Sequence, residues 1–244
     1  MAVTGVALLS SAKKALASRS NIQAIAFDGF AILDPRPVFA LVDELYPEKG
    51  VELSNLWRTR QFEYTWLRTL SHRYSDFRQV TDDALVFAGK ALKLELSPQK
   101  HARLMETYFR LRCWADVPAA LSSLKKAGIR TALLSNLTSG MLEAGIRNSQ
   151  LDGMFDHVLS TDRVRVYKPD PHAYQMGVEA FGLNPEQILF GAFAGWDAAG
   201  AKSFGYPTFW VNRQNQPAEQ LGVAADASGS TLQDLVAFVM SNNG

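Results

Sequence analysis

The stretch "AIAFDGFAILD" (residues 24–34) joins a short apolar run to an acid and then becomes apolar again. A brief apolar run bounded by a turn is typical of a strand that is buried on both faces. Asp28 stands where that strand ends, and ligands of parallel sheets bind at the carboxyl ends of strands. The stretch therefore predicts a carboxylate beside a binding site. An acid at this place can also cap the following turn, and the stretch alone leaves both roles open.

Similar apolar runs recur along the chain. Together with the first run, they span residues 22–28, 129–135, 157–160, 187–193 and 208–212. Helical patterns separate them, and one helix is expected to open at Val117-Pro118 and to stop at Gly128, which is the usual placement of proline and glycine. Buried strands that alternate with helices predict an α/β fold, a Rossmann-like parallel sheet with helices on both faces.

Residues 36–112 interrupt this alternation, because they contain helical patterns and no strand pattern. A helical block that follows the first strand is expected to form an inserted cap over the strand ends. The sequence thus predicts an N-terminal extension at 1–21 and an α/β core built from 22–35 and 113–244, with the helical cap between the two core segments.

Composition excludes several classes of partner. The 244 residues include 25 basic and 24 acidic side chains, so a net charge of +1 gives no footprint for nucleic acid. No apolar stretch is long enough to predict a membrane span. The single cysteine, Cys113, cannot form an internal disulfide and indicates a reducing compartment, the cytoplasm. The apolar N-terminal segment lacks a preceding basic region and is interpreted as an extension, not a signal peptide.

Further polar residues follow the other predicted strands. Ser135 and Asn136 come after the second strand, ahead of a helix that Thr138 could cap, and such a helix start favours an anion. Lys168 lies in "VYKPDPHAY", and Asp197 lies in "GWDAAGA" after the fourth strand. A nucleophilic carboxylate, a cation that keeps it ionised and a second carboxylate that activates water form a hydrolytic set.

The order of these motifs resembles the haloacid dehalogenase superfamily from residue 22 onward. Within it, the chain is most similar to the type II L-2-haloacid dehalogenases. The stretches that carry this resemblance are "LWRTRQFEYTWLR" (56–68), "YKPDPHAY" (167–174) and "GWDAAGAKSFGYPTFWVNR" (195–213).

The resemblance implies covalent catalysis on a small 2-substituted carboxylic acid. Asp28 would attack the C2 carbon, expel the leaving group and form an ester, which water activated by Asp197 would hydrolyse. Lys168 would keep Asp28 ionised, and Tyr174 matches the position that supports this lysine. Ser135 and nearby backbone amides would bind the substrate carboxylate.

The resemblance also implies a halide site and an apolar pocket. Arg58 and Asn136 match the positions that accept a departing halide, and Arg58 shares a helix face with Phe62, four residues later. The other residues expected to contact substrate are Phe30, Phe62, Phe77, Tyr174, Phe193 and Trp196. The family implies a homodimer packed through the cap helices.

Phosphatases of the same superfamily carry features that this chain lacks. They place a second aspartate two residues after the nucleophile, where this chain has Phe30, and they hold Mg²⁺ with further carboxylates, whereas Ala201 follows Asp197 by four residues. Phosphoryl transfer without a metal would lack its main charge compensation. The four histidines, His72, His101, His157 and His172, show no metal-ligand spacing. We therefore expect a reaction without metal or cofactor.

Two motifs depart from the dehalogenase pattern. Ile32 replaces a threonine that would hydrogen-bond the nucleophile, and Ala192, Phe193 and Ala194 replace a Ser-Ser-Asn stretch. One positioned polar contact commonly contributes a factor of about 10²–10³ in rate. Hydrolysis of L-2-haloacids with inversion at C2 is the main expectation. Two alternatives stay open: hydrolysis of a strained ring such as azetidine-2-carboxylate, or a binding protein that has lost the chemistry.

Overall fold

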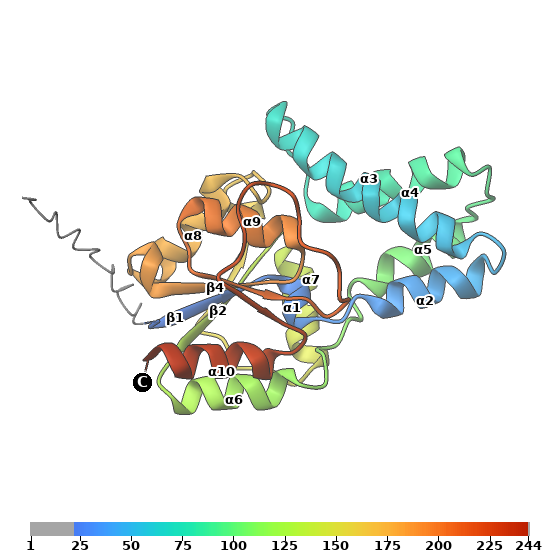
Figure 1. Cartoon of the computed structure of the whole chain (residues 1–244). Coiled ribbons are helices and arrows are strands. Elements are labelled where there is room, and N and C mark those ends of the chain that lie inside the picture. Colours follow the sequence, from blue (N-terminus) through green and yellow to red (C-terminus); the bar gives the residue numbers. More distant parts are fainter. Residues whose placement is uncertain (1–21, 244) are drawn as a thin grey trace, which may run out of the picture.

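The computed structural model describes residues 22–243, so the predicted extension at 1–21 lies outside the described residues. At its centre is a parallel sheet of six strands in the order β3-β2-β1-β4-β5-β6 (Figure 1). The strands are β1 (Ala24–Phe27), β2 (Arg130–Ser135), β3 (His157–Ser160), β4 (Ile188–Ala192), β5 (Thr208–Val211) and β6 (Ala227–Gly229). The five apolar runs all form strands, as predicted. Strand β6 was not predicted, because its three small, partly exposed residues form no apolar run.

Helices cover both faces of the sheet (Figure 1). One face carries α6 (Val117–Lys126) and α10 (Leu232–Asn243), and the other carries α8 (Pro171–Phe181) and α9 (Gly195–Phe204). The side chains of β1 alternate between the two layers, since Ile25 and Phe27 join the first core cluster and Ala24 and Ala26 join the second. Ala24 and Ala26 share the second cluster with side chains of α8 and α9, such as Tyr174 and Ala198. The predicted α/β architecture is confirmed.

Helix α7 (Ser139–Asn148), the single-turn α1 (Gly29–Ile32) and the 3₁₀ turns η1 (Thr161–Arg163) and η2 (Pro185–Gln187) complete the elements around the sheet. Thr138 caps α7, as predicted, because its hydroxyl accepts a hydrogen bond from the Met141 amide at 3.2 Å.

Between α1 and α6 the chain forms four helices, and we refer to them as the inserted helices. They are α2 (Arg36–Leu45), α3 (Gly50–Leu70), α4 (Phe77–Ala91) and α5 (Pro98–Thr107). In Figure 1 they extend to one side of the sheet, with α3 packed along α4. The indole nitrogen of Trp57 in α3 donates to the carbonyl oxygen of Thr81 in α4 at 2.8 Å, which fixes this helix pair.

The chain enters and leaves the inserted helices through two adjacent extended segments. Leu33 and Cys113 form an antiparallel bridge, and the amide of Asp34 donates to the carbonyl oxygen of Arg112 at 2.8 Å. This pairing lies just beyond α5, which ends at Thr107, before the limit of residue 112 that the sequence predicts for the helical block. Beyond the end of α5, hydrogen bonds between the two segments replace the hydrogen bonds of the helix.

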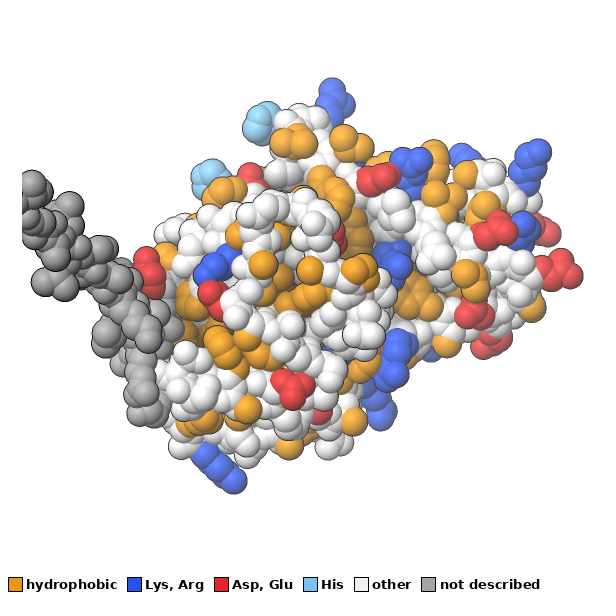
Figure 2. All heavy atoms as spheres, viewed as in Figure 1, with side chains coloured by type: hydrophobic (Ala, Val, Ile, Leu, Met, Phe, Trp, Pro, Cys, Tyr) orange, Lys and Arg blue, Asp and Glu red, His pale blue; other side chains and the backbone are white. Residues whose placement is uncertain are grey.

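The face of the molecule shown in Figure 2 does not carry charges of a single sign. In the space-filling view, acidic and basic side chains are mixed over the inserted helices and the sheet-bearing part of the molecule (Figure 2). No helix among residues 22–243 has the length and apolar character needed to cross a membrane.

Candidate active site

Asp28 is held in place by the turn that it begins. As the N-cap of α1, it accepts a hydrogen bond from the Phe30 amide to Oδ2 at 2.9 Å. The capping role that the sequence left open is therefore present, and it fixes the direction of the carboxylate. Gly29 allows the end of β2 to lie close by, since a Cβ atom there would stand 2.5 Å from the Ser135 Oγ. Oδ1 is directed to a different partner.

That partner is Lys168, whose ammonium lies between two carboxylates. Its Nζ is 2.8 Å from Asp28 Oδ1 and 2.5 Å from Asp197 Oδ2, and the side chain is only 1% exposed. Burial by itself lowers the pKa of this ammonium, but the negative charges of Asp197 and Asp28 outweigh burial and raise the pKa above its usual value. The lysine is therefore a permanent cation against the carboxylate of Asp28.

Asp197, in the first turn of α9, is as deeply buried as the lysine. Burial raises the pKa of its carboxyl to about 6, helped by the charge of Asp28 and opposed by Lys168 and by the Tyr174 hydroxyl. A carboxylate with that pKa accepts a proton more readily than an ordinary aspartate, which suits a general base near neutral pH.

Tyr174 donates its hydroxyl hydrogen to Asp197 Oδ1 at 2.7 Å. Tyr174, which is expected to support Lys168, thus contacts the lysine's partner Asp197, whose other oxygen accepts from the Lys168 ammonium. Burial, followed by the charge of Asp197, raises the tyrosine pKa well above its usual value, so that the hydroxyl remains a donor.

The carboxylates of Asp28 and Asp197 border a small cavity of about 20 Å³, which Phe62 of α3 and Phe77 of α4 cover from the side of the inserted helices. Its lining residues are Asp28, Phe30, Phe62, Phe77, Ser135, Asn136, Leu137, Phe193, Ala194, Trp196 and Asp197. Every residue that the sequence proposed for the substrate pocket lines this cavity except Tyr174, which lies behind Asp197. Leu137 and Ala194 were not proposed as contacts. Each is the chain neighbour of a predicted residue, which is the signal that could have found it.

Aromatic contacts close the cavity between the core and α3. Phe62 meets Trp196 edge to face, with ring centroids 5.4 Å apart, and Trp66 meets the same indole at 5.5 Å. On the opposite wall, the rings of Phe30 and Phe193 are 6.1 Å apart. Such walls exclude water and strengthen the charge interactions inside.

Two polar side chains complete the cavity at the end of β2. Ser135 Oγ accepts a hydrogen bond from the Leu137 amide at 3.1 Å, and Asn136 Oδ1 accepts from the Lys168 amide at 3.0 Å. The Asn136 Nδ2, by contrast, is buried without a hydrogen-bond partner. Buried donors are rarely left unsatisfied, so this amide is available to an anionic or polar ligand in the cavity.

Arg58, which the sequence is expected to place at the halide site, is not among the residues that line this cavity. It is exposed and borders a separate surface depression with Asp43 and Asn55, and its guanidinium carbon is 5.7 Å from the centre of the Phe39 ring. Arg58 and Phe62 share a face of α3 and lie about 6 Å apart along its axis, and of the two only Phe62 lines this cavity.

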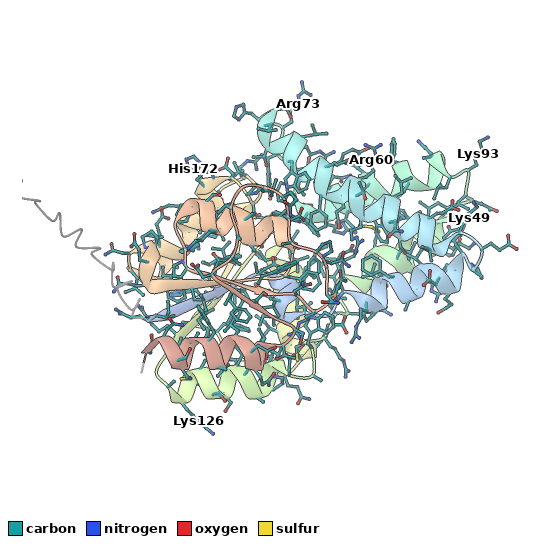
Figure 3. All side chains as sticks on the ribbon, viewed as in Figure 1. Lys49, Arg60, Arg73, Lys93, Lys126 and His172 are labelled. Atoms are coloured by element: carbon teal, nitrogen blue, oxygen red, sulfur yellow. The ribbon has the colours of Figure 1, made fainter. Side chains whose placement is uncertain are left out.

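The histidines and the cysteine lie apart from the site. His172 projects outward from the start of α8, and its side chain is 81% exposed (Figure 3). His101 contacts Asp82 on the inserted helices, and the ring of His157 packs against Phe181. Cys113 has no disulfide partner and lies where the chain returns to the core.

Comparisons with known proteins agree with this geometry. The haloacid dehalogenase-like hydrolase family model matches residues 11–205. The (S)-2-haloacid dehalogenase of Pseudomonas sp. (strain YL) is 41% identical over 88% of this chain and 93% of its own length. The crystal structure of another L-2-haloacid dehalogenase superposes with a TM-score of 0.88 at 41% identity, covering 90% of this chain and 99% of that one.

A third similar protein is an L-2-haloacid dehalogenase from Xanthobacter autotrophicus whose structure holds covalently bound chloropropionic acid. It superposes with a TM-score of 0.82 at 32% identity over 90% of this chain and 98% of that one. The residues that the family model matches include β1 to β4, the inserted helices and all three charged residues of the buried cluster. A buried Asp-Lys-Asp cluster at the ends of parallel strands, together with matches of this extent, shows that the chain belongs to the haloacid dehalogenase-like hydrolases.

Proposed function

We propose that the protein hydrolyses the carbon–halogen bond of small L-2-haloacids through an ester on Asp28, with inversion at C2. The observation that carries this proposal is the Lys168 ammonium set between two carboxylates at the floor of an aromatic cavity. Relatives that span nearly the whole chain are named for this activity. Release of halide from L-2-chloropropionate, with the aspartyl ester detected by mass spectrometry, tests it. A protein that forms no ester and releases no halide would contradict it.

The first step is a displacement at carbon. A carboxylate oxygen of Asp28 attacks C2 from the side opposite the halogen, a C–O bond forms, and the halide leaves with the electron pair of the broken bond. Lys168 keeps the attacking oxygen ionised, and Ser135 holds the substrate carboxylate together with backbone amides. The unpaired Asn136 amide supplies a donor to the departing halide. Arg58 has no part in this proposal, because it lies outside the cavity.

The second step returns Asp28 to its carboxylate. Asp197 accepts a proton from water, and the resulting hydroxide attacks the carbonyl carbon of the ester. The bond between that carbon and the substrate oxygen breaks, and the 2-hydroxy acid leaves after taking a proton. Tyr174 and Lys168 hold Asp197 from its two oxygens, so its position is fixed during proton transfer.

The reaction rate is expected to fall as the pH drops through about 6, because Asp197 must be unprotonated to accept a proton from water and its pKa is raised to about 6. Below that value, the rate of ester hydrolysis decreases by about tenfold for each pH unit. Single-turnover measurements of ester decay across this range provide the test. Asp197→Asn has no titrating group at this position. This variant is expected to accumulate the ester, and its rate of ester hydrolysis should not show the decrease below about pH 6. A wild-type rate that stays level a full unit below about 6 would contradict the assignment of the base.

Phe193 is expected to limit the size of the C2 substituent. Its ring fills the wall opposite Phe62 and Trp196, beside Phe30 and Trp114. Phe193→Ala removes that wall, so the ratio of kcat/KM for 2-bromohexanoate to that for bromoacetate should rise by about tenfold or more, which corresponds to the burial of one or two methylene groups. Phe204→Ala, a similar change on the far side of α9, serves as the matched control. An unchanged ratio would remove Phe193 from the specificity wall.

A second candidate substrate is favoured by the same wall. Phe193 and Ala194 line the cavity without a polar side-chain atom, an environment that suits an apolar ring as well as a methyl group. Azetidine-2-carboxylate would offer Asp28 a strained C–N bond at the equivalent carbon. Incubation with this acid, followed by a search for an amino-hydroxy acid product, separates the two substrates.

We further propose that the inserted helices act as a cap, with the domain limits expected from the sequence, and that two copies associate through them in the cytoplasm. Val51, Leu67 and Leu70 support the proposed association, since they are 68%, 58% and 78% exposed on α3. Burial of these side chains between copies would remove apolar surface from water. Sedimentation should give a dimer for the wild type and a monomer for Leu67→Glu/Leu70→Glu, and a wild-type monomer would contradict this arrangement.

A further inference from the structure

A set of contacts outside the cavity joins the inserted helices to the loop that carries Lys168. We call these contacts the tyrosine clasp. On the side of the inserted helices it consists of Thr69 in α3 and of Tyr74 and Ser75 just after α3. On the other side it consists of Asp162 and Tyr167, which lie between β3 and α8. The Tyr74 hydroxyl donates to Asp162, the Tyr167 hydroxyl donates to the Ser75 carbonyl oxygen at 2.5 Å, and the Tyr167 amide donates to Thr69 Oγ1 at 3.0 Å. The two tyrosine rings lie 5.1 Å apart.

The clasp is adjacent to the charged cluster through the backbone. Tyr167 is fully buried and immediately precedes Lys168. Two consecutive amides are thereby held from different parts of the protein, since Thr69 of α3 accepts from the Tyr167 amide and Asn136 of the core accepts from the Lys168 amide. The Tyr167 ring also packs edge to face on Phe77, with ring centroids 6.4 Å apart, so it supports a wall of the cavity.

The hydroxyls of Tyr74 and Tyr167 stay protonated and therefore act as hydrogen-bond donors. Burial, together with the hydrogen bond to Asp162, raises the pKa of Tyr74, and burial raises the pKa of Tyr167. The Arg165 guanidinium lies 5.2 Å from the centre of the Tyr74 ring and completes the outer side of the clasp. Hydrogen bonds of buried or partly buried groups to a charged acceptor are stronger than those between neutral groups, so the bond to Asp162 is the strongest candidate to anchor the loop.

We infer that Thr69, Tyr74 and Tyr167 are positioning residues for Lys168, so that docking of the inserted helices and placement of the ammonium between the two carboxylates are one event. The inference rests on the proposed role of Lys168 in the reaction. It follows that loosening the clasp lets the ammonium drift from Asp28 and Asp197 while the side chains that touch substrate stay intact.

Two variants remove clasp contacts with little change in volume. Thr69→Val deletes the acceptor for the Tyr167 amide, and Tyr74→Phe deletes the donor to Asp162. Two matched controls make the same changes elsewhere on the inserted helices. Thr107→Val changes a threonine of α5 whose hydroxyl, like that of Thr69, donates to a carbonyl oxygen one turn back, and Tyr64→Phe changes a tyrosine of α3 that packs on Phe87.

The expected result is a fall in kcat of about tenfold or more for each clasp variant, because displacements near 1 Å can cost about a hundredfold, with KM changed much less. The groups that face Asp197 are Lys168, Asp28 and Tyr174, and among them Lys168 lowers the pKa of Asp197. A displaced ammonium therefore moves the acid limb of the pH profile to higher pH. A merely structural role would lower the melting temperature and leave that limb in place. Both controls should match the wild type.

Hydrogen exchange supplies a readout that needs no substrate. Peptides covering 161–170 should exchange faster in Thr69→Val than in Thr107→Val, because the Tyr167 amide has lost its acceptor. If the clasp variants match their controls in kcat, pH limb and exchange, the inference is overturned. If Lys168→Met and Asp28→Asn also keep full activity, the proposed function has failed instead, so the two failures are distinguishable.

Discussion

Replacement of Asp28 by asparagine abolishes halide release from L-2-chloropropionate, with a loss in kcat/KM of more than about 10³-fold. The amide oxygen of asparagine can still accept the hydrogen bond from the Phe30 amide, so the cap of α1 and the fold persist. An uncharged amide, however, is a poor nucleophile towards a saturated carbon. Halide release under single-turnover conditions, followed with an ion-selective electrode, measures the effect, and mass spectrometry should find no ester.

The matched control is Asp234→Asn, which neutralises an acid in the first turn of α10, outside the cavity. Asp234 accepts hydrogen bonds from Thr231 at a helix start, so Asp234→Asn is the same change in a comparable local setting. It should leave the rate of halide release unchanged. Equal rates for wild type and Asp28→Asn would remove covalent catalysis by this residue, whatever the control shows.

Replacement of Lys168 by methionine should both stop turnover and destabilise the protein. Without the ammonium, the two carboxylates of Asp28 and Asp197 lose their shared counter-ion in a buried site. Breaking such a buried pair typically costs about 3–5 kcal/mol in the free energy of unfolding. Turnover should fall by more than about 10³-fold, because Asp28 no longer has a cation that keeps it ionised.

The pH dependence of stability makes this prediction specific. Removal of the lysine charge raises the pKa of Asp197 further, because that charge lowers it in the wild type. Protonation then relieves the repulsion, so the deficit in the free energy of unfolding should shrink as the pH falls from about 8 to about 5. Urea unfolding at several pH values measures it, with Lys202→Met, which removes a partly exposed ion pair with Asp226, as the control. A deficit that is independent of pH would argue against buried, unpaired carboxylates.

The regular part of the fold could be predicted from local patterns. Buried strands such as β1 and β4 are continuous apolar runs, and Pro118 and Gly128 mark the ends of α6, so periodicity and turn residues were sufficient. Strand β6 and the early end of α5 were not predicted from these local patterns. Both depend on pairing with distant segments, β5 in the first case and the segment at Leu33 in the second, which a local pattern does not encode.

The charged cluster could be anticipated because its members follow strands whose carboxyl ends meet at one edge of the sheet. Two site residues show the limits of this reasoning. Arg58 was linked to the cavity through its helix face, yet position along the helix axis decides whether a side chain reaches the rim. The hydrogen-bond partner of Tyr174 depends on how α8 is rotated relative to α9, which carries Asp197. The tyrosine clasp was not found, since it joins residues nearly one hundred positions apart.

The pairing of β1 has a consequence for biosynthesis. This strand leaves the ribosome first, yet Ala24 pairs with Arg130 on one side and with Ile188 on the other. Its apolar surface therefore waits for most of the chain to be translated, and long-range pairings of this kind slow folding. Nascent chains that end before β4 would expose a central strand edge, so truncated or stalled products should depend on chaperones or be degraded, whereas the full-length product closes its sheet in one late step.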